Sequence, residues 1–203
     1  MKNQLLPILI GLVLAVGILV SFLALYNPPV PARLNDVHFH ADFKVFINGE
    51  AFDFTRSQYQ SDENHVLNPA MHLHDGNGNI LHKHQSDATI GDFFDSIGMQ
   101  LSSRCLVLDN NDSYCNSGEQ TLKMRVNEKP NYQFGDYSLN DLDRILISYG
   151  NESESQLTLQ MDSVTDLACV NSNKCPDRGT PADESNCTVE NGCVDYALST
   201  QLS

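Results

Sequence analysis

Histidine is the residue type with the clearest chemical potential in this sequence, because all seven histidines fall between positions 38 and 84. Six of them form three His-x-His pairs. On a β-strand, residues i and i+2 point to the same face, so each pair presents two imidazoles roughly 6.5–7 Å apart. Neutral imidazole is a preferred ligand of zinc and copper. We therefore expect a copper or zinc ion bound by the set His38, His40, His65, His72, His74, His82 and His84.

Two of the pairs lie in the stretch MHLHDGNGNILHKH, which predicts a β-hairpin with DGNGN, residues 75–79, as its loop. With that loop His72 lies opposite His82, and facing residues point to the same side of a sheet. All four histidines of the hairpin then share one face, while Leu73 and Leu81 point to the core. A loop longer or shorter by one residue would place the two pairs on opposite faces.

Other side chains near the histidines extend the predicted site. Met71 and Met99 are candidate soft ligands for Cu(I). The carboxylates of Asp42, Asp75 and Asp87 are candidate acceptors that would fix the imidazole tautomers.

Three other interpretations of the histidines compete with a metal-binding protein. One is a solvated polar face on an antiparallel sheet, and another is a pH-sensing patch whose imidazoles repel each other once protonated. The third is a zinc enzyme, in which an open position lowers the pKa of bound water to about 7. The number of imidazoles is high enough to fill the coordination shell of an ion, which favours binding over catalysis.

The residues around the histidines predict a small α+β domain over residues 37–162. Its first strand contains HFHADFKVFI and turns back at Asn48-Gly49, a strong hairpin signal. A short helix follows the histidine hairpin, capped by Asp87 or Thr89, and Gly98 ends it. The stretches LKMRVNEKPNYQF and DLDRILISYG predict further strands, the last one ending at Gly150.

The order strand, strand, helix, strands resembles that of a β-grasp, and residues 122–150 resemble the C-terminal half of ubiquitin-like domains, especially the small sulfur carriers. This resemblance implies a β-grasp-like mixed sheet with one short helix. The chain departs from the sulfur carriers after Gly150, where it continues into NESESQLTLQM instead of ending on a Gly-Gly tail. Sulfur carriage is therefore not implied.

The order of HFHADFKVFINGE, MHLHD, TIGDFFDSIGM and RILISYG also resembles a group of poorly characterised, membrane-anchored, His-rich exported proteins of archaea and little-studied bacteria. Some of them are labelled disulfide isomerases. The sequence contains no Cys-x-x-Cys that would supply a low-pKa thiol beside its resolving partner. The residues themselves do not support isomerase chemistry.

The N-terminal segment predicts a membrane anchor. Residues 5–26 are uncharged and long enough to cross a hydrocarbon core of roughly 30 Å as a helix. We expect a transmembrane anchor over residues 1–26 and an extended linker over 27–36, with a cleaved signal peptide as the alternative. This predicts a single-pass protein of the cell membrane, with its C-terminal domain outside the cytoplasm.

Six cysteines agree with an oxidising compartment. Cys105 and Cys115 flank a polar loop, and the other four lie in a Cys-rich tail, residues 163–203. The five-residue gaps between the tail cysteines are wide for a zinc module. We expect disulfides throughout, with the pairing within the tail left open. The six residues are Cys105, Cys115, Cys169, Cys175, Cys187 and Cys193.

The net charge of −14 argues against nucleic acid as a partner, because the chain would repel phosphates. The predicted partners are the membrane, a metal ion and an exported protein. The sequence thus predicts metal capture, handover or a metal-stabilised interaction. An interaction module or a thiol-disulfide protein without a catalytic metal is the alternative.

Overall fold

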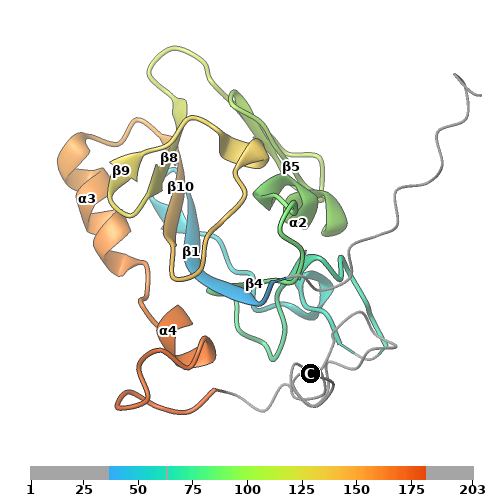
Figure 1. Ribbon diagram of the computed structural model, residues 1–203. Coiled ribbons are helices and arrows are strands. Elements are labelled where there is room, and N and C mark those ends of the chain that lie inside the picture. Colours follow the sequence, from blue (N-terminus) through green and yellow to red (C-terminus); the bar gives the residue numbers. More distant parts are fainter. Residues whose placement is uncertain (1–36, 63, 182–203) are drawn as a thin grey trace, which may run out of the picture. The chain divides into compact units, whose positions relative to one another are not determined.

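The structure, a computed structural model, describes residues 37–62 and 64–181 (Figure 1). Its main sheet has seven strands in the order β3-β4-β1-β10-β8-β9, with β2 paired to β1. A second sheet has the order β5-β6-β7. The main strands are β1 (Phe39–Ile47), β2 (Glu50–Ala51), β3 (Met71–His72), β4 (Ile80–Lys83), β8 (Thr121–Val126), β9 (Lys129–Pro130) and β10 (Arg144–Gly150). The second sheet comprises β5 (Gln100–Leu101), β6 (Cys105–Val107) and β7 (Ser113–Cys115).

Strand β1 lies near the centre of the main sheet, between β4 and β10, and its alternate residues point to the two faces of the sheet. Ala41, Phe43 and Val45 are buried in the larger core cluster. The predicted turn at Asn48-Gly49 is confirmed, since both residues adopt positive φ angles of 52° and 86° and β2 pairs antiparallel to β1. On its two long edges β1 pairs parallel to β10 and antiparallel to β4.

Helix α2 (Ile90–Ser96) covers the core face of the sheet, together with the short 3₁₀ helices η1 (Ser57–Tyr59) and η2 (Phe134–Asp136). The predicted cap is confirmed at Thr89, which forms a capping box with Asp92. Ile90, Phe93 and Phe94 are fully buried, as the helical spacing predicts.

Helices α3 (Glu154–Ser163) and α4 (Ala168–Asn171) lie on the other side of the main sheet from α2 (Figure 1). Leu157 and Met161 of α3 pack with Phe46 of β1 in a second core cluster. Arg144 of β10 fixes the end of α3 by donating hydrogen bonds to the main-chain oxygens of Met161, Val164 and Thr165. The sheet therefore has a layer on each face.

The predicted α+β class is confirmed. The predicted anchor, residues 1–26, and the linker, residues 27–36, lie outside the described residues. Within residues 37–62 and 64–181, no helix is both long enough and apolar enough to span a membrane. The first part of the predicted tail, up to residue 181, is described, and its Val164 and Ala168 are buried.

Candidate metal centre

The histidine-bearing strands lie side by side, and the predicted register is confirmed. His72 lies opposite His82 across β3 and β4, and His40 lies opposite His82 across β1 and β4. Leu73 and Leu81 are fully buried in the core cluster on the opposite face, as the five-residue loop requires. His82 thus occupies the middle of a row of three strands.

Six of the seven histidines gather into one group, here called the imidazole cluster. The ring centroid of His82 lies 4.6 Å from that of His40 and 3.9 Å from that of His74. The ring of His84 bridges the two ends, at 5.1 Å from His72 and 4.9 Å from His38. The members of the cluster are His38, His40, His72, His74, His82 and His84.

Three members of the cluster lie close enough together that they could hold a metal ion. One ring nitrogen from each of His38, His40 and His82 lies within 4.8 Å of the other two. His40 and His82 are each only 1% exposed. A solvated polar face would leave these rings open to water, so their burial argues against that interpretation.

A chain of hydrogen bonds assigns the proton on His82. The Asp75 carboxylate accepts from His74 Nδ1 at 2.8 Å, and in neutral His74 this leaves Nε2 as an acceptor. His74 Nε2 contacts His82 Nδ1 at 3.1 Å, so His82 Nδ1 is the donor. The Nε2 atom of His82 then carries the lone pair that a metal ion needs.

The tautomers of two other rings follow from the same logic. Ser172 Oγ donates to Asp141 Oδ1 at 2.6 Å and accepts from His40 Nδ1 at 2.8 Å. His72 Nδ1 donates to the main-chain oxygen of Asn68 at 3.0 Å. In each ring the acceptor nitrogen is again Nε2, which is the arrangement that outer hydrogen bonds give to metal-binding histidines.

The surroundings of His82 favour its neutral form. Burial is the largest cause that holds the pKa of His82 well below 6.5, and repulsion from the surrounding imidazoles lowers this pKa further. His82 is therefore uncharged at neutral pH, and uncharged imidazole is the form that ligates metals.

His65 lies apart from the cluster. Its side chain is exposed, and its Nδ1 contacts the main-chain oxygen of Gln60 at 3.1 Å. Within the part of the chain that the structure describes, no ring contact joins His65 to another histidine. His65 lies in the loop between η1 and β3, outside any strand. The strand alternation that places the other histidines on one face therefore does not apply to it.

The predicted methionine ligands are wrong. Met71 and Met99 are 0% and 1% exposed and belong to the hydrophobic core cluster. Met71 precedes His72 on a strand, and adjacent strand residues point to opposite faces, so the two side chains cannot converge on one ion.

Only one of the three predicted carboxylate acceptors contacts an imidazole. Asp75 does so, whereas Asp42 accepts hydrogen bonds from the main-chain N–H groups of Leu167 and Ala168, both at 2.9 Å. Asp87 is exposed and makes no hydrogen bond to a histidine among the described residues. Asp141 and Ser172 were missed because they are 101 and 132 positions from His40.

Two disulfides are present in the described residues. Cys105–Cys115 joins facing residues of β6 and β7, and Cys169–Cys175 closes a turn after α4. The predicted bonding of these four cysteines is confirmed, while Cys187 and Cys193 lie outside the described residues. Neither disulfide belongs to a Cys-x-x-Cys motif.

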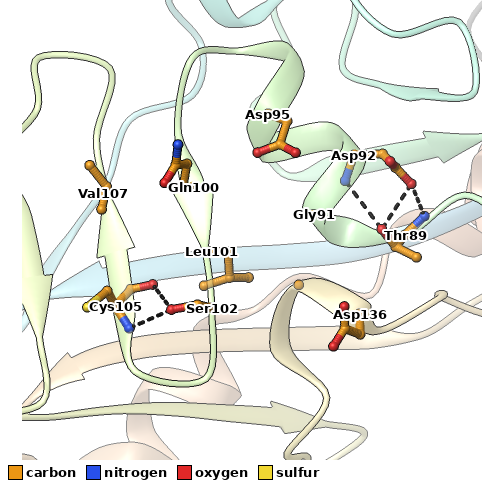
Figure 2. A pocket seen from close by; sticks show the side chains of 11 residues that line it. Thr89, Gly91, Asp92, Asp95, Gln100, Leu101, Ser102, Cys105, Val107 and Asp136 are labelled. Atoms are coloured by element: carbon orange, nitrogen blue, oxygen red, sulfur yellow. Dashed lines mark hydrogen bonds between the residues drawn. The ribbon is translucent and has the colours of Figure 1, made fainter.

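A cavity of about 530 Å³ lies between α2 and the second sheet (Figure 2). Asp92, Asp95 and Asp136 line it, but Asp92 is already engaged in the capping box of α2. None of the predicted metal ligands lines this cavity. The imidazole cluster is therefore the better candidate for the functional centre.

No protein-family model, no curated protein and no solved structure matches this chain.

Proposed function

We propose that this domain binds a zinc or copper ion through His38, His40 and His82. The observation that carries the proposal is the spacing of their ring nitrogens, which lie within 4.8 Å of one another. Nitrogens bound to one tetrahedral zinc ion are about 3.4 Å apart, given Zn–N bonds of about 2.0–2.1 Å. Metal binding would therefore require the three rings to rotate until their nitrogens reach that separation.

A fourth imidazole is available to complete the coordination shell. The ring of His84 lies 4.9 Å from that of His38 and is 4% exposed. Three or four imidazoles without a thioether favour Zn(II) or Cu(II) over Cu(I), because Met71 and Met99 point into the core. A shell filled by histidines suits a protein that holds an ion better than one that activates water on it.

The burial of the ligands supports retention of the ion. His40 belongs to β1 and His82 to β4, so a bound ion would tie these two strands together, while Ser172, which follows α4, supports His40. Among the predicted roles, a metal-stabilised interaction module at the cell surface fits this arrangement better than rapid handover.

The proposed setting is a single-pass, membrane-anchored domain outside the cytoplasm. The apolar run of residues 5–26 supports the anchor, and the two disulfides support an oxidising compartment. An exported protein is the partner that this location suggests. The negative charge continues to argue against nucleic acid.

We also infer that the fold is β-grasp-like. The parallel pairing of β1 with β10 at the centre of the sheet supports this inference. So do the antiparallel neighbours of these two strands, β4 beside β1 and β8 beside β10. Helix α2 falls between β4 and β8 in the chain and packs on the core face. The second sheet and helix α3 are then additions to that plan.

The test is metal analysis of the full-length chain, purified in detergent with its disulfides intact. We expect about one zinc or copper ion per chain. We expect His82→Ala, which removes a ligand, to weaken binding by more than the roughly 10–100-fold typical of losing an outer hydrogen-bond partner, measured by competition with a chelator. His65→Ala is the matched control, because this histidine lies outside the cluster. Equal losses in the two variants, or no metal bound by the unmodified chain, would contradict the proposal.

A further inference from the structure

The segment of residues 165–178 packs against the imidazole cluster from the side of α4. Its start is fixed by Asp42, a residue of β1 that is only 1% exposed. This carboxylate accepts hydrogen bonds from Thr165 Oγ1 and from the main-chain N–H groups of Leu167 and Ala168. Asp42 and His40 share one face of β1, so the segment begins beside the cluster.

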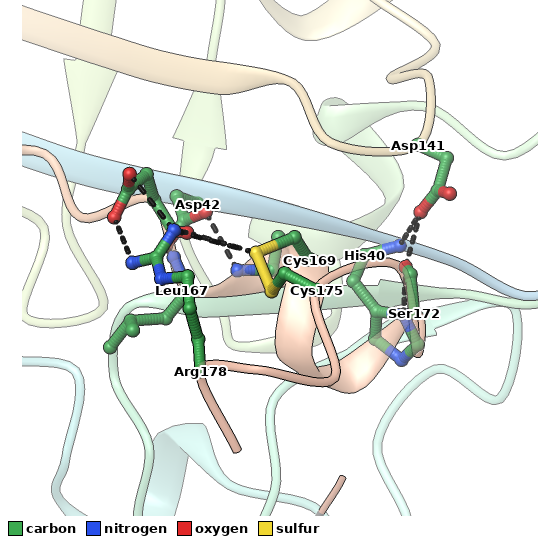
Figure 3. Close-up of a disulfide and its surroundings, with 10 residues drawn as sticks. His40, Asp42, Asp141, Leu167, Cys169, Ser172, Cys175 and Arg178 are labelled. Carbon is green, nitrogen blue, oxygen red and sulfur yellow. Dashed lines mark hydrogen bonds and ion pairs between the residues drawn. A yellow bond between two sulfur atoms is a disulfide. The ribbon is translucent and has the colours of Figure 1, made fainter. Parts of the chain in front are cut away.

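Ser172 brings the segment into direct contact with the proposed ligand His40. The distance from His40 Nδ1 to Ser172 Oγ is 2.8 Å, and Ser172 Oγ donates to Asp141 (Figure 3). Asp141 accepts two further contacts, from the main-chain N–H of His40 and from the Lys174 ammonium.

The Cys169–Cys175 disulfide closes the turn that carries Ser172 and Lys174. Helix α4 has four residues, too few to be stable without tertiary contacts. Within the turn, the N–H of Lys174 donates to the main-chain oxygen of Cys169 at 2.8 Å. Without the disulfide, the position of Ser172 would depend on the hydrogen bonds within this turn and on those that Ser172 and Lys174 donate to Asp141.

We propose that residues 165–178 form a redox-sensitive part of the metal site, in which Ser172 is a positioning residue for His40 and the Cys169–Cys175 disulfide holds it in place. Reduction of this bond then weakens metal binding by freeing the His40 ring from its hydrogen bond. The inference rests on the proposed function, because it concerns the affinity of the same site.

The reductant that the proposal requires is a dithiol. Its two sulfurs become a disulfide, its two electrons break the bond between Cys169 and Cys175, and its two protons pass to the new thiols. The Arg178 guanidinium lies 3.6 Å from the Cys169 sulfur and is paired with Asp166. A cation at this position stabilises a departing Cys169 thiolate, so Cys175 is the sulfur we expect to be attacked.

The test compares Zn²⁺ affinity between two double variants of the full-length chain. We expect Cys169→Ala with Cys175→Ala to weaken binding about 10–100-fold, the usual cost of disturbing an outer hydrogen bond to a ligand. Cys105→Ala with Cys115→Ala is the matched control, because that disulfide lies in the second sheet, and it should leave the affinity unchanged. Chemical reduction followed by alkylation of the thiols should reproduce the first result.

Single variants at Ser172 test the proposed route without removing a disulfide. We expect Ser172→Ala to weaken Zn²⁺ binding as much as loss of the Cys169–Cys175 bond does, with little further loss when the two changes are combined. Ser172→Thr should restore affinity. In ¹⁵N spectra of the histidine rings, His40 should change from the Nδ1–H tautomer to a mixture in Ser172→Ala.

The outcomes separate this inference from the proposed function. Tight Zn²⁺ binding that is unchanged in Ser172→Ala and in the Cys169/Cys175 double variant would overturn the inference and leave the metal site standing. No binding of zinc or copper by the unmodified oxidised chain would overturn both.

Discussion

At the scale of single residues, the chemistry of the imidazole cluster depends on what each Nδ1 atom contacts. His40 donates to a serine, His72 to a main-chain carbonyl and His74 to a carboxylate. Three different acceptors thus produce the same result, an Nε2 atom with a lone pair. The ligand-competent state of these rings is set by residues outside the His-x-His motifs.

The Asp75 carboxylate provides the first prediction. Asp75→Ala removes the acceptor for His74 Nδ1 and thereby loosens the chain that fixes the tautomer of His82. We expect metal affinity to fall about tenfold, the lower end of the usual range, since the Asp75 side chain is 50% exposed to water. Chelator competition measures the change. Asp87→Ala, at an exposed carboxylate without a histidine contact, should have no effect.

Tyr137 provides a prediction on pH dependence. Its hydroxyl donates to Asp143 at 2.7 Å, and burial, followed by this contact, raises its pKa far above the usual 10.0. The folded chain therefore keeps the proton where the unfolded chain loses it. Tyr137 should therefore add no pH dependence to the free energy of unfolding below about pH 10, and the stability that it contributes should fall as the pH rises above that value.

Tyr137→Phe should abolish this alkaline loss and cost about 1.5–3 kcal/mol near pH 7, the value of a hydrogen bond to a charged group. Urea denaturation at pH 7 and at pH 10.5 measures both effects. Tyr132, which is 82% exposed, supplies the control. Tyr132→Phe should change neither the loss of stability at alkaline pH nor the free energy of unfolding at pH 7. An alkaline loss that persists unchanged in Tyr137→Phe would refute this assignment.

At the scale of elements, the residues on the face of β1 opposite helix α2 each contact a different part of the protein. His40 joins the cluster, Asp42 holds the start of α4, and the Lys44 ammonium donates to the main-chain oxygen of Ser163 at 2.7 Å. Phe46 then packs under α3. One strand therefore positions both the metal ligands and the segment that supports them.

The separation of the two faces gives the third prediction. Thr89→Ala removes the cap of α2, and we expect a loss of about 1 kcal/mol in the free energy of unfolding, measured by urea denaturation. Metal affinity should not change, because α2 packs on the face opposite the histidines. Thr158→Ala, at an exposed position of α3, should alter stability by less than about 0.5 kcal/mol.

Local signals made the elements around the site predictable. Asn48-Gly49 specified a turn, Thr89 specified a cap, and strand alternation placed His72 and His82 on one face with the leucines on the other. The same alternation excludes Met71 from the histidine face. The prediction of Met71 as a metal ligand was wrong because it did not apply this alternation. The contacts of Asp141 and Ser172 with His40 depend on tertiary packing of α4, which no local pattern in the sequence encodes.

At the scale of the whole molecule, the proposed ion would link regions that are distant in the chain. The triad joins β1 to β4, and Ser172 adds a segment 132 positions from His40. A ligand that binds only the folded state raises stability by mass action. The unfolded chain separates these groups, so it cannot reproduce the site.

The final prediction follows from this linkage. Free Zn²⁺ at 100 times its dissociation constant should raise the free energy of unfolding by about 2.7 kcal/mol, and a chelator should remove the increase. Urea denaturation of the full-length chain, with and without metal, measures it. His82→Ala should lose the increase while His65→Ala keeps it, because only the first removes a ligand of the triad. A metal-dependent gain of equal size in His82→Ala would mean that the ion stabilises the protein from another site, since the triad cannot hold it with one ligand missing at the centre of the row.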